Sequence, residues 1–553
     1  MTRPLTFIAP VSTLLLAAAL PAQEADTRAL RVDSIFAAAN RPGTPGAALV
    51  VVRDGRVLLE RAYGYADLEH KVPVTPTTVF DVASVSKQFT GLAIAMLVEQ
   101  GRIKLSDDVR KYIPELPNFG PTITIEHLVH HTSGIRDWPL TLVIAGWKFD
   151  DVISFDQILR MAYNQRTLNF TPGAEHTYSN TGYNLLAEVV QRVSGKPFRV
   201  YMDETIFRPL GMTSSHFHDD WTMVVENRAY GYGRVRPDVY RTVTNNLTAL
   251  GSSSLFSTAR DMGKWLANFT DAKVGGDAVR HRGTRARLNN GSTVEYAFGV
   301  VNGMQRGHAN LNHSGSWAGF TSFVLLYPEQ RFGVAVLANG GPTNVGLAAN
   351  LIAGIYLEKE IGLFTPATAP AIATAPEVSV APEVLDRYVG VYRLGPGWYV
   401  RIRRDGNTLR TQATREGEFP LSARSENEFW VTAYNSSMAF RPDSTTGVMT
   451  MLYRGRRAPR LASASPARRP LAELAGEYYS EELATSYVAV VKDTTIALEH
   501  RRHGSISLVH AWGDDYVSTI LPSVEFQRDA RGQVTGFAVL IDERSRNIRF
   551  TKR

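Results

Sequence analysis

Alternating apolar and polar positions predict two β-hairpins, one near each end of the first two thirds of the chain. The stretch GAALVVVRDGRVLLERAYGYAD joins two β-type segments at Asp54 and Gly55, a pair that favours a tight hairpin turn. The stretch TSFVLLYPEQRFGVAVLANG predicts the second hairpin. Helical periodicity lies between them, including residues 84–100 and 183–193. This order predicts an α/β domain to which both ends contribute antiparallel strands.

The pattern changes after residue 363. The Pro- and Ala-rich stretch TPATAPAIATAPEVSVAP, within residues 364–382, predicts an extended linker. Beyond it, LDRYVGVYRL resembles LAELAGEYYS, and MAFRPDSTTGVMTML resembles VEFQRDARGQVTGFAVL. This internal repeat predicts two small antiparallel β domains, barrels or sandwiches, at residues 383–462 and 470–553. The basic run RGRRAPRLASASPARRP between them favours a solvated linker, and contact with an anionic polymer is the alternative.

Composition narrows the class of protein. Of the 553 residues 44% are hydrophobic and 20% are charged, which is typical of a globular chain with several domains. The formal charge of +7 comes without zinc-finger spacing or a dense basic stripe, so no nucleic-acid partner is predicted. The chain has no cysteine, which excludes disulfides, cysteine-bound zinc and thiol catalysis.

The N-terminal stretch MTRPLTFIAPVSTLLLAAALPAQEAD has the anatomy of a signal peptide. A single cation, Arg3, precedes an apolar stretch that ends in small residues near Ala22. A membrane anchor is the less favoured alternative, because a proline and two hydroxyl residues interrupt a stretch that is short for a span. We therefore expect removal of residues 1–22 and export to the periplasm or the medium, with no membrane span in the mature chain.

The stretch FDVASVSKQFTGLAIAMLVEQG contains a Ser-x-x-Lys pattern at the start of a predicted helix. Helical spacing places Ser84 and Lys87 on the same face. A serine hydroxyl is a weak nucleophile until a base takes its proton, and Lys87 can be that base if burial lowers its pKa by about 3 units. The positive end of the helix would stabilise an oxyanion at Ser84. The alternative is that Ser84 only caps the helix.

The stretch EHTYSNTGYNLL contains the only Tyr-x-Asn pattern in the chain. The phenol of Tyr178 can transfer a proton between a nucleophile and a leaving group. The amide of Asn180 can bind the carbonyl and N–H edge of a substrate. The alternative is structural, with Tyr178 packed in a turn and Asn180 capping the helix that follows.

The stretch LNHSGSWAGF contains a His-x-Gly pattern directly before the second hairpin. At Gly315 the missing side chain would let a substrate lie close against the strand. The N–H of Ser316 could then join that of Ser84 as an oxyanion donor, a contribution of about 2.7–4 kcal/mol in the transition state. The alternatives are that His313 is only a polar residue at a strand edge, or that the His-x-Gly at residues 281–283, in polar surroundings, is the relevant one.

The order Ser-x-x-Lys, Tyr-x-Asn, His-x-Gly is more specific than any one pattern, and with it the chain resembles the serine hydrolases related to class C β-lactamases and penicillin-recognising peptidases. Other stretches that carry the resemblance are ITIEHLVHHTSGI, NFTPGAEHTYSNTGYNLLAEVVQRVSG, IFRPLGMTSS and SSSLFSTARDMGKW. The resemblance covers about residues 28–358. It implies an α/β domain of the β-lactamase/transpeptidase type over residues 25–363, with an antiparallel sheet flanked by helices.

The resemblance also implies roles for single residues. Ser84 is the acylated nucleophile, and Lys87 and Tyr178 manage its proton. The backbone N–H groups of Ser84 and Ser316 form the oxyanion hole. The substrate-binding residues are Asn180, His313 and Gly315. Neither a cofactor nor a metal is implied.

One departure from the family pattern matters. No Lys-[Ser/Thr]-Gly occurs in the chain, whereas in β-lactamases and carboxypeptidases of this family that lysine helps to bind a substrate carboxylate. His313 in its place weakens both of those interpretations. Relatives with His-x-Gly include D-aminopeptidases, D-amino-acid amidases and esterases. The D-aminopeptidases also resemble the chain in having two eight-stranded, lipocalin-like barrels after the catalytic domain, and in them a barrel loop narrows the active site.

We therefore expect an exported serine hydrolase of the D-aminopeptidase or esterase type, which cleaves an ester or amide through an acyl-enzyme on Ser84. Its partner would be a small molecule or short peptide, with D-amino acids and cell-wall material as the candidates that the resemblance suggests. The alternatives are a penicillin-binding D-Ala-D-Ala carboxypeptidase or a β-lactamase. An alternative of another class is a non-catalytic protein that binds envelope material.

Other chemistries are less favoured. In EHLVHH, His127 and His131 are four residues apart with His130 beside them, but no His-Glu-x-x-His pattern or third ligand supports a zinc site. His131 is interpreted instead as a structural residue at the start of the HTSG turn. The chain has no Gly-x-Ser-x-Gly, which argues against an α/β-hydrolase, and GSSSLFSTA lacks a phosphate-binding pattern.

Overall fold

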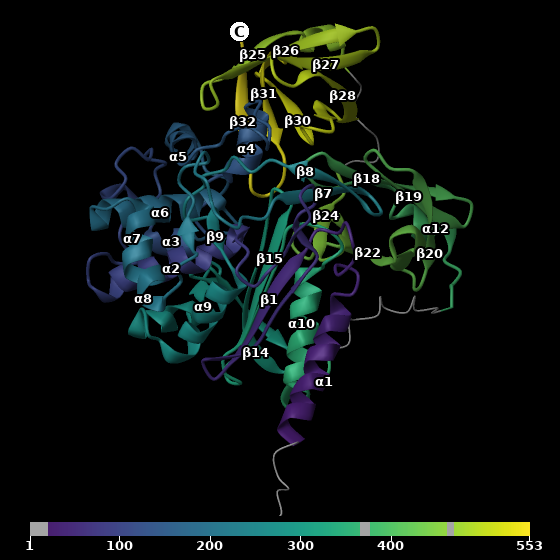
Figure 1. The fold of residues 1–553 in the computed structure, drawn as a ribbon. Helices are drawn as coiled ribbons and strands as arrows, with labels where there is room; N and C mark the ends of the chain where they lie inside the picture. The colour runs from purple at the N-terminus through teal and green to yellow at the C-terminus, as the bar shows by residue number, and fades with distance from the viewer. Residues whose placement is uncertain (1–19, 365–375, 462–468) are drawn as a thin grey trace, which may run out of the picture.

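The computed structural model describes residues 20–364, 376–461 and 469–553, which form an α/β domain and two β-barrels (Figure 1). The predicted signal peptide, residues 1–22, lies almost entirely outside the described residues and stays a prediction. Residues 365–375 of the predicted linker at residues 364–382 also lie outside the described residues. The first described helix is α1 (Leu20–Ile35).

A seven-stranded antiparallel sheet forms the centre of the α/β domain. Strands from the two ends of the domain pair within it, where Ala47 lies opposite Ala338. The hairpin turn between the first two strands has Asp54 at φ 50° and Gly55 at φ 72°, the left-handed conformation that a tight hairpin requires. In sheet order the strands are β12 (Tyr296–Ala297), β13 (Val300–Gln305), β14 (His308–Trp317), β15 (Phe320–Tyr327), β16 (Phe332–Ala338), β1 (Ala47–Arg53) and β2 (Arg56–Tyr63).

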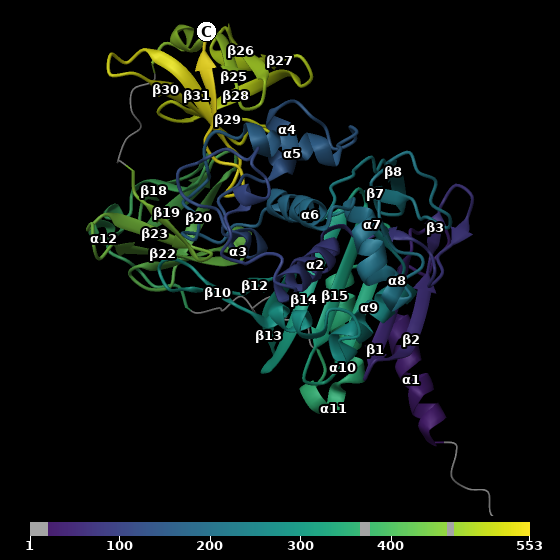
Figure 2. The same ribbon diagram turned by 90° about the vertical axis from the view of Figure 1, so that its left-hand side faces the viewer.

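Both faces of this sheet are covered. Successive side chains of a strand point to opposite faces, so Leu49 and Val51 of β1 pack toward α1 and α10 (Val345–Tyr356). Val50 and Val52 point the other way, into the larger core against α9 (Ala259–Asp271) and the helical part of the domain. The layers are visible in two perpendicular views (Figures 1 and 2). The predicted antiparallel sheet flanked by helices is confirmed.

The helical part of the α/β domain carries the motifs singled out in the sequence. Its helices are α2 (Lys87–Glu99), α3 (Ile125–Val129), α4 (Trp138–Ile144), α5 (Phe155–Asn164), α6 (Asn180–Ser194), α7 (Phe198–Met202) and α8 (Arg208–Leu210), with the short helical turns η1 (Ala83–Ser86), η2 (Val109–Lys111), η3 (Asp203–Phe207) and η4 (Gly276–Gly283). Short strands lie around it: β3 (Tyr65–Asp67), β4 (Val72–Pro73), β5 (Phe80–Asp81), β6 (His216–Phe217), β7 (Gly231–Arg236), β8 (Val239–Val243), β9 (Leu255–Ser257), β10 (Ala286–Arg287) and β11 (Thr293–Val294). Helix α11 (Glu358–Ile361) ends the domain.

Two eight-stranded antiparallel barrels follow; the repeat predicted barrels or sandwiches here, and the family resemblance implied eight-stranded barrels. The first, preceded by α12 (Pro382–Asp386), contains β17 (Gly390–Gly395), β18 (Trp398–Asp405), β19 (Thr408–Ala413), β20 (Glu418–Ala423), β21 (Glu428–Val431), η5 (Thr432–Tyr434), β22 (Ser436–Pro442), β23 (Met449–Tyr453) and β24 (Arg456–Pro459). The second, preceded by η6 (Leu471–Leu474), contains β25 (Gly476–Ser480), β26 (Thr485–Lys492), β27 (Thr495–His500), β28 (Gly504–Trp512), β29 (Asp515–Val517), β30 (Ser523–Arg528), β31 (Val534–Leu540) and β32 (Ile548–Lys552).

The two barrels repeat one another in detail. In the first, the hydroxyl of Tyr392 donates to the carbonyl of Tyr388 at 2.7 Å. In the second, the hydroxyl of Tyr478 donates to the carbonyl of Leu474, also at 2.7 Å. The two tyrosines occupy the same place in the sequence repeat, so the repeat reproduces a tertiary contact as well as a strand pattern.

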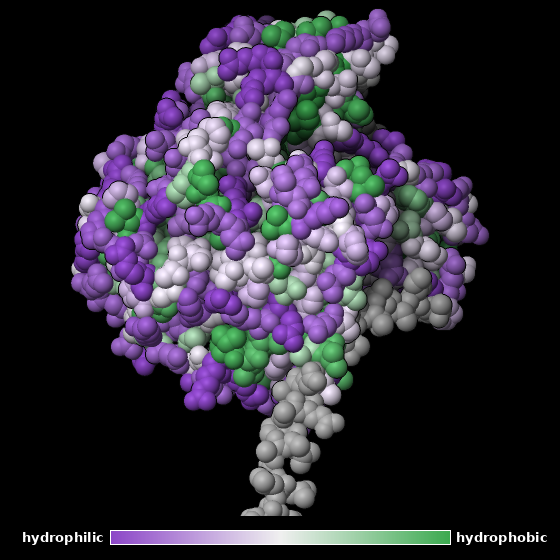
Figure 3. Space-filling model, in the orientation of Figure 1, coloured by the Kyte–Doolittle hydropathy of each residue, from purple (hydrophilic) through white to green (hydrophobic). Residues whose placement is uncertain are grey.

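The second barrel lies over the helical part of the α/β domain, next to α4 (Figures 1 and 2). On the face seen in Figure 3, hydrophobic residues gather only in small scattered groups within a mainly hydrophilic surface. None of the helices in the part of the chain that the structure describes is long and apolar enough to cross a membrane.

Candidate active site

Ser84 lies in a tightly held turn between β5 and α2. The preceding residue, Ala83, has φ 47°, a left-handed conformation that costs a non-glycine residue free energy. Two hydrogen bonds stabilise it: the N–H of Ala83 donates to Asp81 Oδ1 at 2.7 Å, and Ser86 Oγ donates to its carbonyl at 2.5 Å. The turn leaves Ser84 partly exposed while Ser86 and Lys87 are buried, so the candidate nucleophile is accessible on a rigid support.

Lys87 is fully buried directly behind Ser84. Its Nζ lies 3.3 Å from Ser84 Oγ, 2.7 Å from Asn180 Oδ1 and 2.7 Å from the carbonyl oxygen of Ser252. Burial lowers the pKa of Lys87 to about 7, although the nearby Asp137 carboxylate opposes this. A neutral amine is therefore accessible near neutral pH, and at this distance it can accept the Ser84 proton.

Tyr178 completes the group around the nucleophile. Its ring centre lies 4.8 Å from Lys87 Nζ, and its interaction with the Ser84 side chain acts to lower the pKa of its hydroxyl. Burial raises the pKa of Tyr178 well above its ordinary value, so the side chain is a neutral phenol at neutral pH. Of the two candidate bases, Lys87 is thus the one that can hold the proton, and Tyr178 is placed to relay it.

The third motif lies on β14, alongside the Ser84 turn. His313 is buried, with Nδ1 bonded to the carbonyl of Ser314 at 2.6 Å and Nε2 bonded to the hydroxyl of Tyr296 at 2.8 Å. Burial and the nearby Lys87 lower the pKa of His313 to about 3, so the ring is neutral. Both ring nitrogens have protein partners, so direct contact with a substrate requires that one of these bonds be exchanged.

The structure corrects the reason given for Gly315. A Cβ atom there would lie 2.3 Å from the carbonyl oxygen of Val82, 2.4 Å from Ser322 Oγ and 3.1 Å from the amide nitrogen of Ser84. The space is therefore taken by the protein itself and not kept for a substrate. Glycine is needed so that β14 can pack against the nucleophile turn, which brings Ser316 beside Ser84.

Ser316 borders an open cleft next to the nucleophile turn. The cleft has a volume of about 580 Å³, and its wall includes Phe149, Thr242 and Trp317. Two aromatic side chains are thus combined with polar and charged ones, including Asp150 and Arg241. Of the candidate site residues only Ser316 lines this cleft, and Ser84, Lys87, Tyr178 and Asn180 are not part of its wall. A substrate in this cleft therefore stays a prediction, as does the oxyanion role of the Ser84 and Ser316 N–H groups.

Sequence reasoning missed two charged residues beside Asn180. Asp137 is fully buried, and its carboxylate accepts hydrogen bonds from the backbone N–H of Asn180 at 2.8 Å and from its Nδ2 at 3.1 Å. Arg544, in the segment between β31 and β32 of the second barrel, places Nη1 3.6 Å from Asp137 Oδ2. No motif marks either residue, because the contact joins two domains that are distant in the sequence.

The histidines weighed for a metal site serve the fold instead. Nδ1 of His130 bonds the carbonyl of Tyr296 at 2.7 Å, and Nδ1 of His131 accepts from the N–H of Ser179 at 3.2 Å. His131 has φ 57°, in keeping with its interpretation as the residue that opens a turn. Within residues 20–364, 376–461 and 469–553, no group of three or more His, Asp or Glu side chains is arranged to hold a metal ion.

The competing His-x-Gly lies elsewhere. Nε2 of His281, in η4, lies 2.6 Å from a carboxylate oxygen of Glu99, the last residue of α2. Ser84 is at the opposite end of that helix. The structure therefore brings His313 to the nucleophile and leaves His281 apart from it.

The fold is that of the β-lactamase-like domains, and the chain belongs to the beta-lactamase family, whose model matches residues 32–356. It is 27% identical over 423 residues to penicillin-binding protein 4* of Bacillus subtilis (strain 168), which covers 73% of this chain and 92% of that protein. It is 26% identical over 490 residues to a D-aminopeptidase of Gluconobacter oxydans (strain 621H), or 84% of this chain and 85% of that protein. Among solved structures, SurE shares the fold with a TM-score of 0.57 at 23% identity, covering 80% of this chain and 100% of that chain. The predicted family is confirmed.

Proposed function

We propose that this chain is a serine hydrolase that cleaves an ester or amide through an acyl-enzyme on Ser84. The observation that carries the proposal is the buried amine of Lys87, 3.3 Å from Ser84 Oγ and with its pKa lowered to about 7 by burial. A lysine held this way is costly for the fold, because burial opposes its charge. A role in activating the neighbouring Ser84 hydroxyl explains why a buried lysine is present despite this unfavourable free energy.

In the acylation step, Ser84 Oγ attacks the substrate carbonyl carbon while its proton passes to the Lys87 amine, directly or through the Tyr178 hydroxyl. The oxyanion that forms accepts hydrogen bonds from the backbone N–H groups of Ser84 and Ser316. Asn180 orients the substrate with its amide. The tetrahedral intermediate then expels an amine or alcohol, which leaves with the proton returned through Tyr178.

In the deacylation step, water attacks the acyl-Ser84 carbonyl. The same relay takes the proton of the water and returns it to Ser84 Oγ, so that the acid product leaves and the resting site is restored. A neutral Lys87 is required at the start of both half-reactions. The sequence and the geometry around Ser84 require no cofactor for this chemistry.

The substrate class follows from similarity and from the third motif. The similarity to the D-aminopeptidase of Gluconobacter oxydans spans 84% of this chain and therefore extends into the barrels. His313 stands where a carboxylate-binding lysine is expected in carboxypeptidases and β-lactamases. We therefore favour small amides, esters or peptides with an N-terminal D-residue, hydrolysed outside the cytoplasm after removal of residues 1–22.

The experiment compares D-alanine p-nitroanilide, its L-enantiomer and p-nitrophenyl acetate on the purified mature chain. The Ser84→Ala variant should lose all turnover, and the matched Ser314→Ala variant, changed at an exposed neighbour on β14, should keep it. Cleavage of only the D-anilide identifies a D-aminopeptidase, and cleavage of only the ester identifies an esterase. Full activity of Ser84→Ala would overturn the proposal.

A second candidate is a penicillin-binding carboxypeptidase or a β-lactamase, favoured by the similarity to penicillin-binding protein 4* of Bacillus subtilis. It predicts a penicilloyl adduct on Ser84, seen by mass spectrometry of the intact chain after exposure to benzylpenicillin. A long-lived adduct supports a penicillin-binding protein, and rapid hydrolysis supports a β-lactamase. Absence of any adduct in a chain that cleaves the D-anilide would remove this candidate.

A further inference from the structure

Asp137 holds the amide that faces the catalytic lysine. It precedes α4, yet its side chain does not cap that helix and instead accepts from both the backbone N–H and Nδ2 of Asn180. Because Nδ2 is bound to a carboxylate, the other end of the amide, Oδ1, must point to Lys87, and the two atoms lie 2.7 Å apart. Asp137 therefore determines which end of the Asn180 amide meets the lysine.

A buried carboxylate needs positive charge nearby, and here that charge comes from two domains. Lys87 supplies it from the α/β domain, with Asn180 between the two. Arg544 supplies it from the second barrel, with Nη1 3.6 Å from Asp137 Oδ2, and it shares its charge with Asp542 of the same barrel, whose Oδ2 lies 2.9 Å from Nη2 and 3.0 Å from Nε. The backbone of Arg544 is held as well, because its carbonyl accepts from the N–H of Asp137 at 3.0 Å and from Asn169 Nδ2 at 2.8 Å.

The segment that carries Arg544 is docked firmly. Arg136, 1% exposed, donates to the carbonyls of Arg546 at 2.9 Å and Asn547 at 3.3 Å. It also forms a buried ion pair with Glu482 of the same barrel at 2.6 Å. These contacts of Arg136 hold the backbone of the segment in place. The guanidinium of Arg544 is therefore kept close to Asp137.

We propose that Arg544 is a positioning residue of the active site, which neutralises Asp137 and so keeps Asn180 and Lys87 in the arrangement that activates Ser84. This rests on the proposed function of Ser84. Without the guanidinium, Lys87 would be the only cation beside Asp137 and would retain its proton to higher pH. The titratable groups that face Lys87 from the elements packed around it are Asp137, His131, Tyr178, Tyr183 and His313. None of the others is a carboxylate, so Asp137 is the group through which Arg544 acts.

The test measures the titration of Lys87 in full-length protein labelled with ¹³C-lysine, assigned by a Lys87→Arg variant, and in parallel the pH profile of kcat/KM for a p-nitrophenyl ester. In Arg544→Met we expect the midpoint of Lys87 and the acidic limb of the profile to rise together by about one pH unit. Arg544→Lys should restore both toward the wild type. The control is Arg546→Met. Arg546 lies in the same segment as Arg544, and this variant loses the ion pair of Arg546 with Glu175 of the α/β domain. It should shift neither the Lys87 midpoint nor the acidic limb of the profile.

The outcomes separate this proposal from the proposed function. An unchanged Lys87 midpoint in Arg544→Met overturns the positioning role. An equal shift in Arg546→Met also overturns it, because loose docking of the segment would then be the cause. A shifted midpoint in a chain that cleaves no ester or amide leaves the positioning of Lys87 standing and refutes the proposed function alone.

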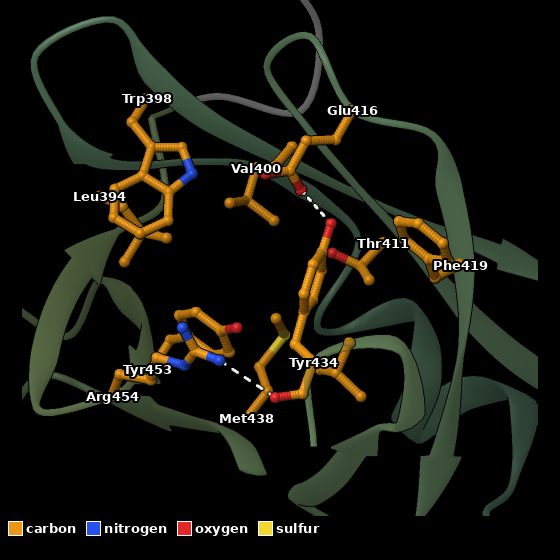
Figure 4. Close-up of a pocket in the computed structure, with 12 residues that line it drawn as sticks. Leu394, Trp398, Val400, Thr411, Glu416, Phe419, Tyr434, Met438, Tyr453 and Arg454 are labelled. Carbon is orange, nitrogen blue, oxygen red and sulfur yellow. Dashed lines mark hydrogen bonds between the residues drawn. The ribbon is translucent and has the colours of Figure 1, made fainter. Parts of the chain in front are cut away.

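An independent observation concerns the first barrel, which contains a partly open cavity of about 80 Å³ (Figure 4). Its wall is mostly apolar, with Leu394, Trp398 and Met438 among its residues. Thr411 and Tyr453, 5% and 6% exposed, also line it, and among the described residues neither hydroxyl has a hydrogen-bond partner. Neither hydroxyl is among the fully buried polar atoms that lack a partner, so both remain accessible and can form hydrogen bonds with a ligand.

Size and charge restrict the guest. The cavity is far smaller than the pockets of about 300–1,000 Å³ that take drug-sized ligands, so it admits no more than a single ring. At its rim Tyr434 lies between two opposite charges: its hydroxyl donates to Glu416, and its carbonyl accepts from Arg454 at 3.0 Å. Because one negative and one positive side chain lie at the rim, the rim favours a ligand with an uncharged polar group over an anion. We infer that the first barrel binds an uncharged single-ring molecule that carries a hydroxyl or carbonyl group.

Saturation-transfer NMR on the full chain with benzyl alcohol, toluene and benzoate tests this inference. We expect benzyl alcohol to bind several-fold more tightly than either of the others. The isosteric variants Thr411→Val and Tyr453→Phe should each remove the preference over toluene, while Ser84→Ala should leave it unchanged. Absence of transfer to all three probes, or a preference that survives both hydroxyl deletions, would refute the site.

Discussion

At the scale of single residues, the site depends on one lysine whose charge the fold opposes. Lys87 must lose its proton to accept that of Ser84, and burial brings its pKa down to about 7. Activity should therefore be low below this pH, where the amine is charged, and should rise as pH increases through it. We expect the acidic limb of kcat/KM for an ester without ionisable groups to have its midpoint near pH 7.

The substitution that tests whether Lys87 causes this acidic limb is Lys87→Met, which keeps the length of the side chain and removes the base. Loss of a general base costs about 10²–10⁴-fold in rate, and the acidic limb should vanish with it. Lys264→Met is a suitable control, since Lys264 lies in α9 and pairs with Asp261 at 2.9 Å. A profile with the same limb in Lys87→Met would show that another group titrates.

Gly315 gives a sharper test of packing at the nucleophile, because the chain offers a matched glycine. An added Cβ at Gly315 would approach the Val82 carbonyl oxygen to 2.3 Å, whereas one at Gly283 would meet nothing within 4 Å. Gly315→Ala should destabilise the domain by about 1–3 kcal/mol, as overpacking does. It should also lower kcat/KM by more than its stability explains, because the strand can yield only by moving the Ser84 turn.

Gly283→Ala should change neither the melting temperature nor kcat/KM. The pair of variants also decides between the two His-x-Gly patterns by experiment. Equal effects of the two substitutions would contradict the placement of β14 against the nucleophile turn.

At the scale of elements, the ion pair between Arg136 and Glu482 anchors the second barrel to the α/β domain. Both side chains are buried, and removing one partner of a buried pair costs about 3–5 kcal/mol because it leaves the other charge unpaired. Glu482→Gln should therefore lower the first thermal transition clearly in calorimetry. Removing the more exposed interdomain pair, by Asp151→Asn at the contact with Arg502, should have little effect.

A double variant separates charge from packing at this anchor. Arg136→Met combined with Glu482→Leu removes both charges together, so it should be more stable than Glu482→Gln alone. A double variant as unstable as the single one would mean that the contacts of Arg136 with the Arg546 and Asn547 carbonyls, and not the ion pair, hold the barrel.

The elements also show which structure the sequence could predict. Hairpins with an Asp-Gly turn and a repeated strand pattern are local signals, and both led to the observed strands. The repeat even located equivalent tyrosines, Tyr392 and Tyr478, each bonded to a carbonyl four residues before it. By contrast, the reason for Gly315 was misread, because the atoms that exclude a side chain there come from the Ser84 turn on another element.

At the scale of the whole molecule, some residues of the candidate site could be predicted from the sequence and others could not. Ser84, Lys87, Tyr178 and Asn180 were found from spacing and family resemblance, because each stands in a short motif. Arg544 stands in no motif, and its relevance arises only when a barrel packs against α4. Long-range docking of one domain on another leaves no periodic pattern in either segment, so sequence reasoning could not find it.

A chain that ends at residue 469 puts the role of the second barrel to a direct test. It would lose Arg544 beside Asp137 and Glu482 beside Arg136, leaving two buried charges without their partners. We expect the truncated chain to be less stable and to lose at least about tenfold in kcat/KM on a small ester, because Lys87 would then be the only cation facing Asp137. Adding Arg136→Met should recover stability, since it removes the unpaired cation, but should not recover activity. A truncated chain with the kcat/KM of the full-length protein would mean that the α/β domain is catalytically self-sufficient and that the barrel acts only on stability or substrate choice.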